Sequence, residues 1–164
     1  MYIELQATAQ FLDNIRIDLD RPHPFAAERV GFVTTELHGD MQVGKVIILS
    51  RYLSVPDNEY VPNELVGAEI GRVAIRRMLG EILSSRQGIM HVHMHDHDGI
   101  PRLSRTDATG LPPMIRGFQN LSLDVANGIL LLSRNALNAW VWLKGGEAQQ
   151  VTKVSVTGGV NYDQ

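Results

Sequence analysis

The 164-residue sequence contains no cysteine. Disulfide bonds, thiolate metal sites and cysteine nucleophiles are therefore excluded, and the absence fits a reducing compartment. No apolar run approaches the roughly 18 residues that a membrane-spanning helix needs. The first ten residues lack a basic segment followed by an apolar one. We therefore expect no signal peptide and a cytoplasmic protein.

A large net charge of either sign is also missing, since the formal net charge is -3 at pH 7. This value gives no electrostatic reason to expect nucleic acid or an anionic membrane as a partner. The sequence has no internal repeat and no low-complexity tract. Hydrophobic residues make up 44% and charged residues 20%, which is ordinary for a globular protein. We expect one domain, residues 1–164, with a core that needs no disulfide bond.

Histidines gather in one short stretch. The sequence has six, and four of them occupy alternate positions: His91, His93, His95 and His97. In an extended strand, residues two apart point to the same face, at roughly 6.5–7 Å between Cα atoms. Two neutral imidazoles placed in this way can bind one divalent metal ion. Burial of several unpartnered imidazoles would be costly, so the pattern favours a metal site over core histidines.

A Ser-x-x-Asp group, Ser104 to Asp107, follows the histidines. It has two compatible interpretations. Ser104 can begin a helix with Asp107 completing a capping box, and Asp107 can also supply a carboxylate to the metal. Gly110 and the pair Pro112–Pro113 predict that such a helix is limited to a turn or two.

Hydrophobic periodicity predicts the element order β-α-β-β-α-β-β-β-β. The predicted helices cover residues 9–20 and 63–86, the second capped by Asn63, and a broken helix lies within residues 104–119. A turn is expected at residues 38–40. Besides the histidine strand that starts at residue 88, the predicted strands cover residues 1–8, 25–35, 43–53, 128–133, 139–143 and 151–157. The pattern indicates an α/β fold: a single-domain layer sandwich with a mixed β-sheet flanked by helices.

A hydrolytic zinc site needs three protein ligands and one open position. His91, His93 and Asp107 can supply such a set. The carboxylate that acts as general base must then come from elsewhere in the chain.

Three sequence groups, in this order, resemble the JAMM motif of the JAB/MPN metalloproteases. They are Glu28-Arg-Val-Gly31-Phe-Val, His91-Val-His93 and Ser104-Arg-Thr-Asp107. Proteins of that family remove ubiquitin or ubiquitin-like proteins from conjugates. The resemblance extends over residues 1–143.

The resemblance implies an MPN-like fold with one zinc ion held by His91, His93 and Asp107. Glu28 would be the general base, and Ser104 would stabilise the oxyanion. The substrate bond would follow the C-terminal glycine of a ubiquitin-like protein. The histidine-rich loop resembles that of bacterial JAB proteins encoded beside E1- and E2-like enzymes. This likeness implies those enzymes as partners and bacterial ubiquitin-like conjugation, including antiphage defence, as the setting.

The position of the ligand pair stays open. Ten residues separate His93 from Ser104, eight separate His95 from Ser104, and the family usually has seven. The pair could therefore lie further along the strand. Glu36 is a rival base, but a strand would place it roughly 26 Å from Glu28, so both cannot reach one metal.

Other functional classes fit less well. A serine hydrolase needs G-x-S-x-G, and the zinc nucleobase deaminases need P-C-x-x-C; both motifs are absent. The H-x-H-x-D-H pattern of metallo-β-lactamase-fold enzymes is matched one residue out of register, and that fold needs a longer chain. A non-catalytic MPN-like scaffold or metal-binding module is the remaining alternative.

Overall fold

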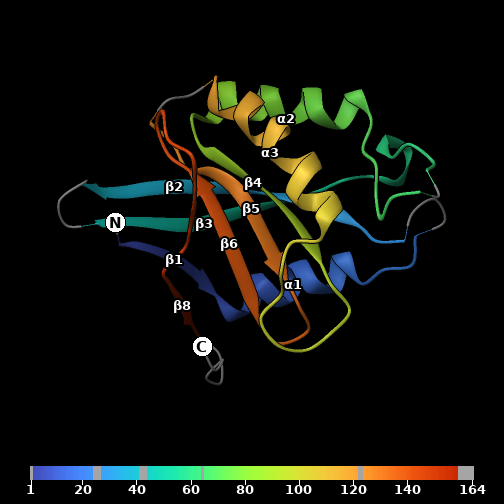
Figure 1. Cartoon of the computed structure of the whole chain (residues 1–164), viewed down its shortest axis with the longest axis horizontal. Helices are drawn as coiled ribbons and strands as arrows, with labels where there is room; N and C mark the ends of the chain where they lie inside the picture. The colour runs from blue at the N-terminus through green and yellow to red at the C-terminus, as the bar shows by residue number, and fades with distance from the viewer. Residues whose placement is uncertain (1, 24–26, 41–43, 64, 122–123, 159–164) are drawn as a thin grey trace.

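An eight-stranded mixed sheet lies between helices in the computed structural model, which describes residues 2–23, 27–40, 44–63, 65–121 and 124–158 (Figure 1). The strand order is β7-β6-β5-β4-β2-β3-β1-β8. The strands are β1 (Ile3–Thr8), β2 (Val30–Asp40), β3 (Gly44–Ser54), β4 (Gly88–Met94), β5 (Asn127–Leu132), β6 (Leu137–Trp142), β7 (Ala148–Gln150) and β8 (Lys153–Thr157). The helices are α1 (Ala9–Leu19), α2 (Arg72–Ser85) and α3 (Arg105–Gln119), with a short 3-10 helix η1 (Asp57–Glu59). This architecture confirms the predicted α/β class with a mixed sheet.

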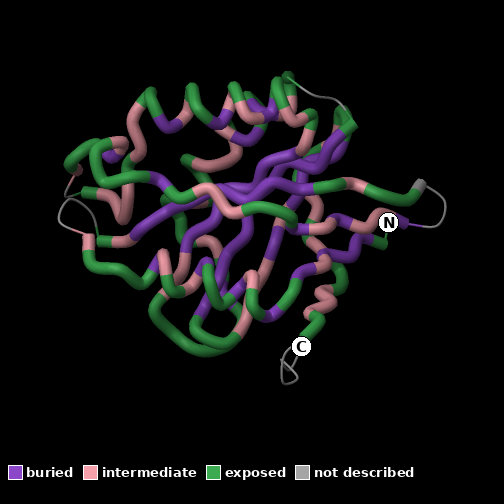
Figure 2. The backbone as a smooth tube through the Cα atoms, turned by 180° about the vertical axis from the view of Figure 1, so that it is seen from behind, coloured by how far each residue is buried: buried purple, intermediate pink, exposed green. Residues whose placement is uncertain are grey.

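Each face of the sheet has its own hydrophobic core, because successive strand residues point to opposite faces. Met90 and Val92 of β4 pack on the side of α1. Ile89 of the same strand packs on the side of α2 and α3. His91 and His93 share the face of Ile89, so they lie under α2 and α3. Buried residues run along the central strands between the helices (Figure 2).

The histidine strand β4 occupies the middle of the sheet. It pairs with β2 in antiparallel orientation and with β5 in parallel orientation. Both of its backbone edges are therefore used, which fixes the positions of its side chains. Among the helices of the described residues, none combines the length and the apolar character that crossing a membrane requires.

The prediction of a helix over residues 63–86 is wrong in its first part, since α2 begins only at Arg72. The Asn63 side chain accepts a hydrogen bond from the Leu65 amide and closes a local turn instead of capping a helix. The segment then folds back, with Val61 donating to the Glu69 carbonyl. Within α2 the helical spacing holds, because Ala74, Met78 and Ile82 are buried.

The expected break in the third helix is also wrong. Helix α3 runs from Arg105 to Gln119 with Pro112 and Pro113 inside it. Each proline removes a backbone hydrogen bond and disfavours the helix locally. Ile115 and Phe118, one turn further on, are fully buried against the sheet. Their burial and the cap at Ser104 offset that cost.

Most predicted strands are confirmed with shifted ends. The strand predicted from residue 25 begins at Val30, and residues 24–26 lie outside the described ranges. Strand β2 continues through the turn expected at residues 38–40, since Gly39 pairs with Lys45 in the β2–β3 hairpin. The last predicted strand, residues 151–157, corresponds to β8, and the short strand β7 before it was not predicted.

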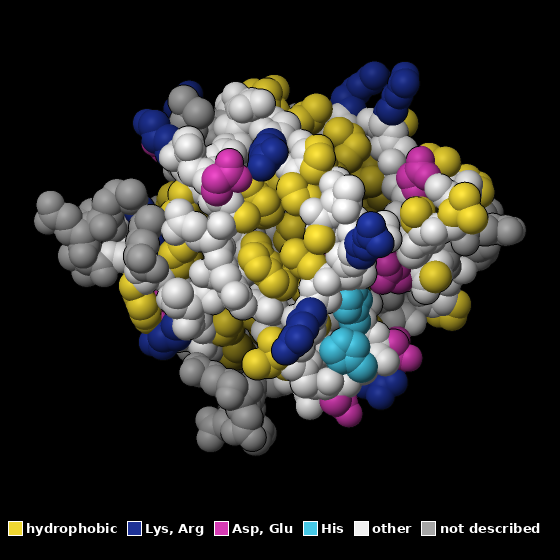
Figure 3. All heavy atoms as spheres, in the orientation of Figure 1, with side chains coloured by type: hydrophobic (Ala, Val, Ile, Leu, Met, Phe, Trp, Pro, Cys, Tyr) yellow, Lys and Arg dark blue, Asp and Glu magenta, His cyan; other side chains and the backbone are white. Residues whose placement is uncertain are grey.

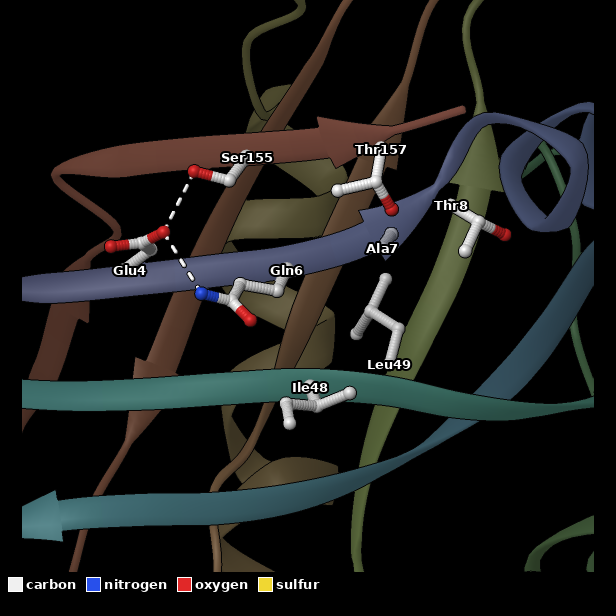
Figure 4. Close-up of a pocket in the computed structure, with 8 residues that line it drawn as sticks. All are labelled: Glu4, Gln6, Ala7, Thr8, Ile48, Leu49, Ser155 and Thr157. Atoms are coloured by element: carbon white, nitrogen blue, oxygen red, sulfur yellow. Dashed lines mark hydrogen bonds between the residues drawn. The ribbon is translucent and has the colours of Figure 1, made fainter. Parts of the chain in front are cut away.

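A buried carboxylate fastens the edge strand β8 to β1. Both oxygens of Glu4 accept hydrogen bonds, from Ser155 and Gln6 at one and from Tyr2 and Lys153 at the other. Figure 4 shows Glu4 between Ser155 and Gln6 in a shallow hollow along β1, β3 and β8. The hydrogen bond from Ser155, followed by those from Tyr2 and Gln6, lowers the pKa of Glu4 to about 2.

Replacement of Glu4 by Gln should lower the free energy of unfolding by about 1.5–3 kcal/mol at pH 7, because bonds to a charged group are lost. Since the folded pKa is depressed, the wild-type advantage is present above the ordinary value of 4.5 and disappears as the pH falls toward about 2. Urea unfolding of both proteins at several pH values measures this gap. A gap that stays constant down to pH about 2 would contradict the role given to the Glu4 charge.

Candidate metal centre

A glutamate lies just before β2, near the histidines of β4. Val30 pairs with His93, and Phe32 pairs with His91. Glu28 precedes Val30 by two residues, in a bend before the strand begins. The start of β2 therefore brings Glu28 to the end of β4 that carries His93 and is followed by His95.

Glu28, His93 and His95 form a group with the composition of a metal site. Each offers one ligand atom, and these atoms all lie within 4.8 Å of one another. The Oδ2 atom of Asp107 lies 3.4 Å from Nε2 of His93 and 3.7 Å from Nε2 of His95. Figure 3 shows histidines at the surface near acidic side chains, beside a stretch of hydrophobic side chains.

The Ser104–Asp107 pair caps α3 and also faces the histidines, so both interpretations of this group are compatible. Ser104 Oγ accepts from the Asp107 amide, and Asp107 Oδ2 accepts from the Ser104 amide and hydroxyl at 3.0 and 2.6 Å. Burial alone would raise the pKa of Asp107, but His93 and Ser104 outweigh it and hold that pKa well below its usual range. The carboxylate is therefore ionised and available to a cation.

His91 is buried beside the group. It is 4% exposed, and its Nδ1 has no hydrogen-bond partner within the described part of the chain. Its ring meets Phe32 edge to face, with centroids 5.6 Å apart. Burial, followed by the nearby His93, lowers the pKa of His91 to about 3. Of the three expected ligands, only His93 belongs to the 4.8 Å group. Asp107 lies beside it, within 3.7 Å of both His93 and His95, whereas no such contact with His91 is seen among the described residues.

His93 is at the centre of the group, and both of its ring nitrogens are buried without hydrogen bonds among the described residues. The residue is 1% exposed. A buried imidazole without partners is unfavourable. His95 is partly exposed, and burial, followed by the nearby His93, lowers its pKa. Lowered imidazole pKa values favour the neutral form that binds metals.

Gly67 leaves space for the Glu28 side chain because glycine has no Cβ atom. The Glu28 amide donates to the Gly67 carbonyl at 3.0 Å. A Cβ atom on Gly67 would lie 2.0 Å from Oε1 of Glu28, far inside van der Waals contact. Burial is the main cause that raises the pKa of Glu28, so the carboxylate holds a proton more readily than an exposed one.

Two further contacts fix the chain around Glu28. The Arg29 guanidinium, 3% exposed, donates to Asp57 and to the carbonyls of Arg21 and Pro22. The Tyr60 hydroxyl exchanges two hydrogen bonds with the backbone of Val30. The start of β2, and Glu28 with it, is thus tied to the segments on either side.

Glu36, the rival base, lies further along β2, beyond its last pairing with β4. The β2–β4 register ends there with Thr35 paired to Gly88, whereas the histidines are at the far end of β4. Glu36 is exposed and accepts a hydrogen bond from Gln87. The geometry therefore separates Glu36 from the histidine group.

Sequence reasoning selected His91 and His93, left a pair further along the strand open, and did not identify Gly67. The spacing to Ser104 could not settle the pair, because neither His93 with ten intervening residues nor His95 with eight matches the usual seven. No signal in the sequence pointed to Gly67, because its importance depends on a contact with a residue 39 positions earlier, Glu28.

Comparison with protein-family models gave no match, and comparison with curated proteins gave none either. The chemistry of the site therefore has to be argued from its residues. Two imidazoles and one carboxylate, with a second carboxylate beside them, form a donor set that suits a divalent metal such as zinc.

Proposed function

We propose that this chain is a zinc-dependent peptidase or isopeptidase of the JAMM type. One observation carries the proposal: the ligand atoms of Glu28, His93 and His95 lie within 4.8 Å of one another, and the Asp107 carboxylate lies 3.4 Å from His93. A base next to two imidazoles and one carboxylate is the combination that metal-assisted hydrolysis requires.

The residues fit a zinc ion. Ligand atoms about 2.0–2.1 Å from a tetrahedral zinc are separated from each other by roughly 3.3 Å. The distances of 3.4 and 3.7 Å from Asp107 to the two histidines are close to that separation. A metal would also give the buried His93 ring a partner. We therefore assign the ligands as His93, His95 and Asp107, one step along the strand from the pair His91 and His93 expected from the sequence.

Zinc, when bound, polarises the substrate carbonyl and lowers the pKa of water. Glu28 takes a proton from the attacking water and passes it to the leaving amine. Its raised pKa suits both halves of this transfer, because the group must also give the proton back. The Ser104 hydroxyl orients Asp107, and it can donate to the developing oxyanion when it turns away from that carboxylate.

The substrate class follows from the resemblance to the JAMM motif: a ubiquitin-like protein with a C-terminal glycine, as a precursor or in a conjugate. Hydrophobic side chains at the surface beside the histidines support a protein substrate (Figure 3). Several hydrophobic side chains that pack against the α2/α3 core are only partly buried, among them Leu103, Leu111, Met114 and Trp140. E1- and E2-like enzymes would be the partners that build such conjugates.

The test combines metal content with cleavage. Purified protein should contain one zinc ion per chain by mass spectrometry and should cleave a fusion carrying a ubiquitin-like protein, and a chelator should abolish this cleavage. Zinc without cleavage of any fusion in a panel of ubiquitin-like proteins would favour a metal-binding module or scaffold, in which Ser104 and Asp107 serve only as a helix cap. Protein that binds no zinc would overturn the proposal.

Gly67→Ala should lower turnover by about 10–100-fold, because the added methyl group displaces the Glu28 carboxylate from its place beside the histidines. Zinc affinity should stay unchanged, since Gly67 contacts no ligand in the assignment above. Steady-state kinetics and zinc titration measure the two effects.

Gly80→Ala is the matched control, since nothing lies within 4 Å of a Cβ atom at that exposed position of α2. It should keep full activity and gain up to about 1 kcal/mol of stability from the higher helix propensity of alanine. Full activity in Gly67→Ala would show that Glu28 does not need its observed position.

A further inference from the structure

The four histidines form a continuous row from the interior to the surface. Successive ring centroids are 5.3, 5.2 and 5.8 Å apart, from His91 through His93 and His95 to His97. His91 is buried and His97 is exposed. His97 takes no part in the ligand set assigned above, yet it continues the row at the same spacing.

The ring of His97 is held in one tautomer. Its Nδ1 lies 2.8 Å from the Asp98 carbonyl oxygen, and a carbonyl only accepts, so Nδ1 carries the proton. Nε2 then carries the lone pair. Metal-binding histidines commonly have this arrangement, with one nitrogen donating to a carbonyl and the other left for the ion.

The loop that carries His97 is anchored and acidic. Its backbone accepts from Arg134, and the Gly99 amide donates to Asn135. Asp96 and Asp98 flank the histidine, and both are exposed. The Asp96 carboxylate is paired with the Arg134 guanidinium at 2.6 Å, so Asp98 supplies the negative charge that attracts cations to His97.

We propose that His97 is a loading ligand: it captures the incoming divalent cation through Nε2 and hands it to His95, the outermost ligand of the site. This step rests on the zinc site proposed above. A residue that only assists transfer changes the association and dissociation rates together, because it does not bind the ion in the final complex. The ring centroids of His97 and His95 are 5.8 Å apart, so the ion would move only a short distance from one ring to the other.

The experiment follows zinc uptake by the metal-free full chain in a stopped-flow instrument, with a zinc-binding dye as the competitor. In His97→Ala, uptake and release should both slow by about 5-fold or more, while the dissociation constant should stay within about 2-fold of the wild-type value. His38→Ala is the control, since His38 is also exposed to solvent but lies beside Glu36, toward the other end of β2. It should load at the wild-type rate.

Each other outcome overturns the inference. An unchanged uptake rate in His97→Ala, with zinc bound normally, removes the loading role and leaves the proposed function intact. Two zinc ions in the wild type and one in His97→Ala would make His97 a permanent ligand. If the wild type itself binds no zinc, the proposed function fails together with this inference.

Discussion

The Glu28→Gln protein is expected to bind zinc like the wild type and to lose hydrolytic turnover by about 10²–10⁴-fold. Glutamine has the shape of glutamate but cannot take a proton from the attacking water. Asp107 cannot replace Glu28 as the base, because His93 and Ser104 lower the pKa of Asp107 and make it a weak proton acceptor. Single-turnover cleavage of a ubiquitin-like fusion, run beside a zinc titration, measures both effects.

Glu36→Gln is the matched control for this experiment, because Glu36 is in β2, beyond its last pairing with β4 and away from the histidines. It should retain turnover. The opposite pair of results, full activity in Glu28→Gln and none in Glu36→Gln, would show that the base has been assigned to the wrong carboxylate.

The second large effect concerns the ligands. His95→Ala should weaken zinc binding by more than about 100-fold, since loss of an outer-shell partner alone costs 10–100-fold. His91→Leu should leave zinc binding unchanged, because His91 is outside the group of ligand atoms. Zinc titration of the two variants therefore decides between the pair His93–His95 and the pair His91–His93.

Stability without metal provides an independent check on His91. Leucine has nearly the volume of histidine and removes a buried Nδ1 that has no hydrogen-bond partner among the described residues. The free energy of unfolding of the metal-free protein should therefore stay the same or rise in His91→Leu. Loss of zinc in His91→Leu with the fold intact would restore His91 as a ligand and contradict the assignment made from the register.

Much of the fold could be predicted from the sequence because hydrophobic alternation is strong in the central strands. The six residues of β5 are all buried, and their continuous apolar run indicated a central strand. The errors arose where a local interaction competed with periodicity. Asn63 closes a turn that looks like a helix cap, and α3 continues through Pro112 and Pro113 because distant residues pack on it.

The candidate site was predictable as a set of residue types but not as a geometry. Glu28, Asp107 and the alternating histidines could all be selected from the sequence. The choice between His91 and His95 depends on the pairing of Val30 with His93, which fixes where Glu28 falls along the histidine row. Strand register is a long-range property, so spacing along the chain alone could not supply it.

The candidate site combines residues held by regular elements with one residue held by an irregular segment. His93 belongs to the doubly paired β4, and Asp107 to a capped helix, whereas Glu28 precedes β2 and rests on Gly67 in a segment outside the sheet. Leu65 in that segment is 93% exposed. In the proposed enzyme, metal affinity would depend on β4 and α3, and the catalytic rate would depend also on the segment that contains Gly67. A change in that segment would therefore alter the rate while the metal stays in place.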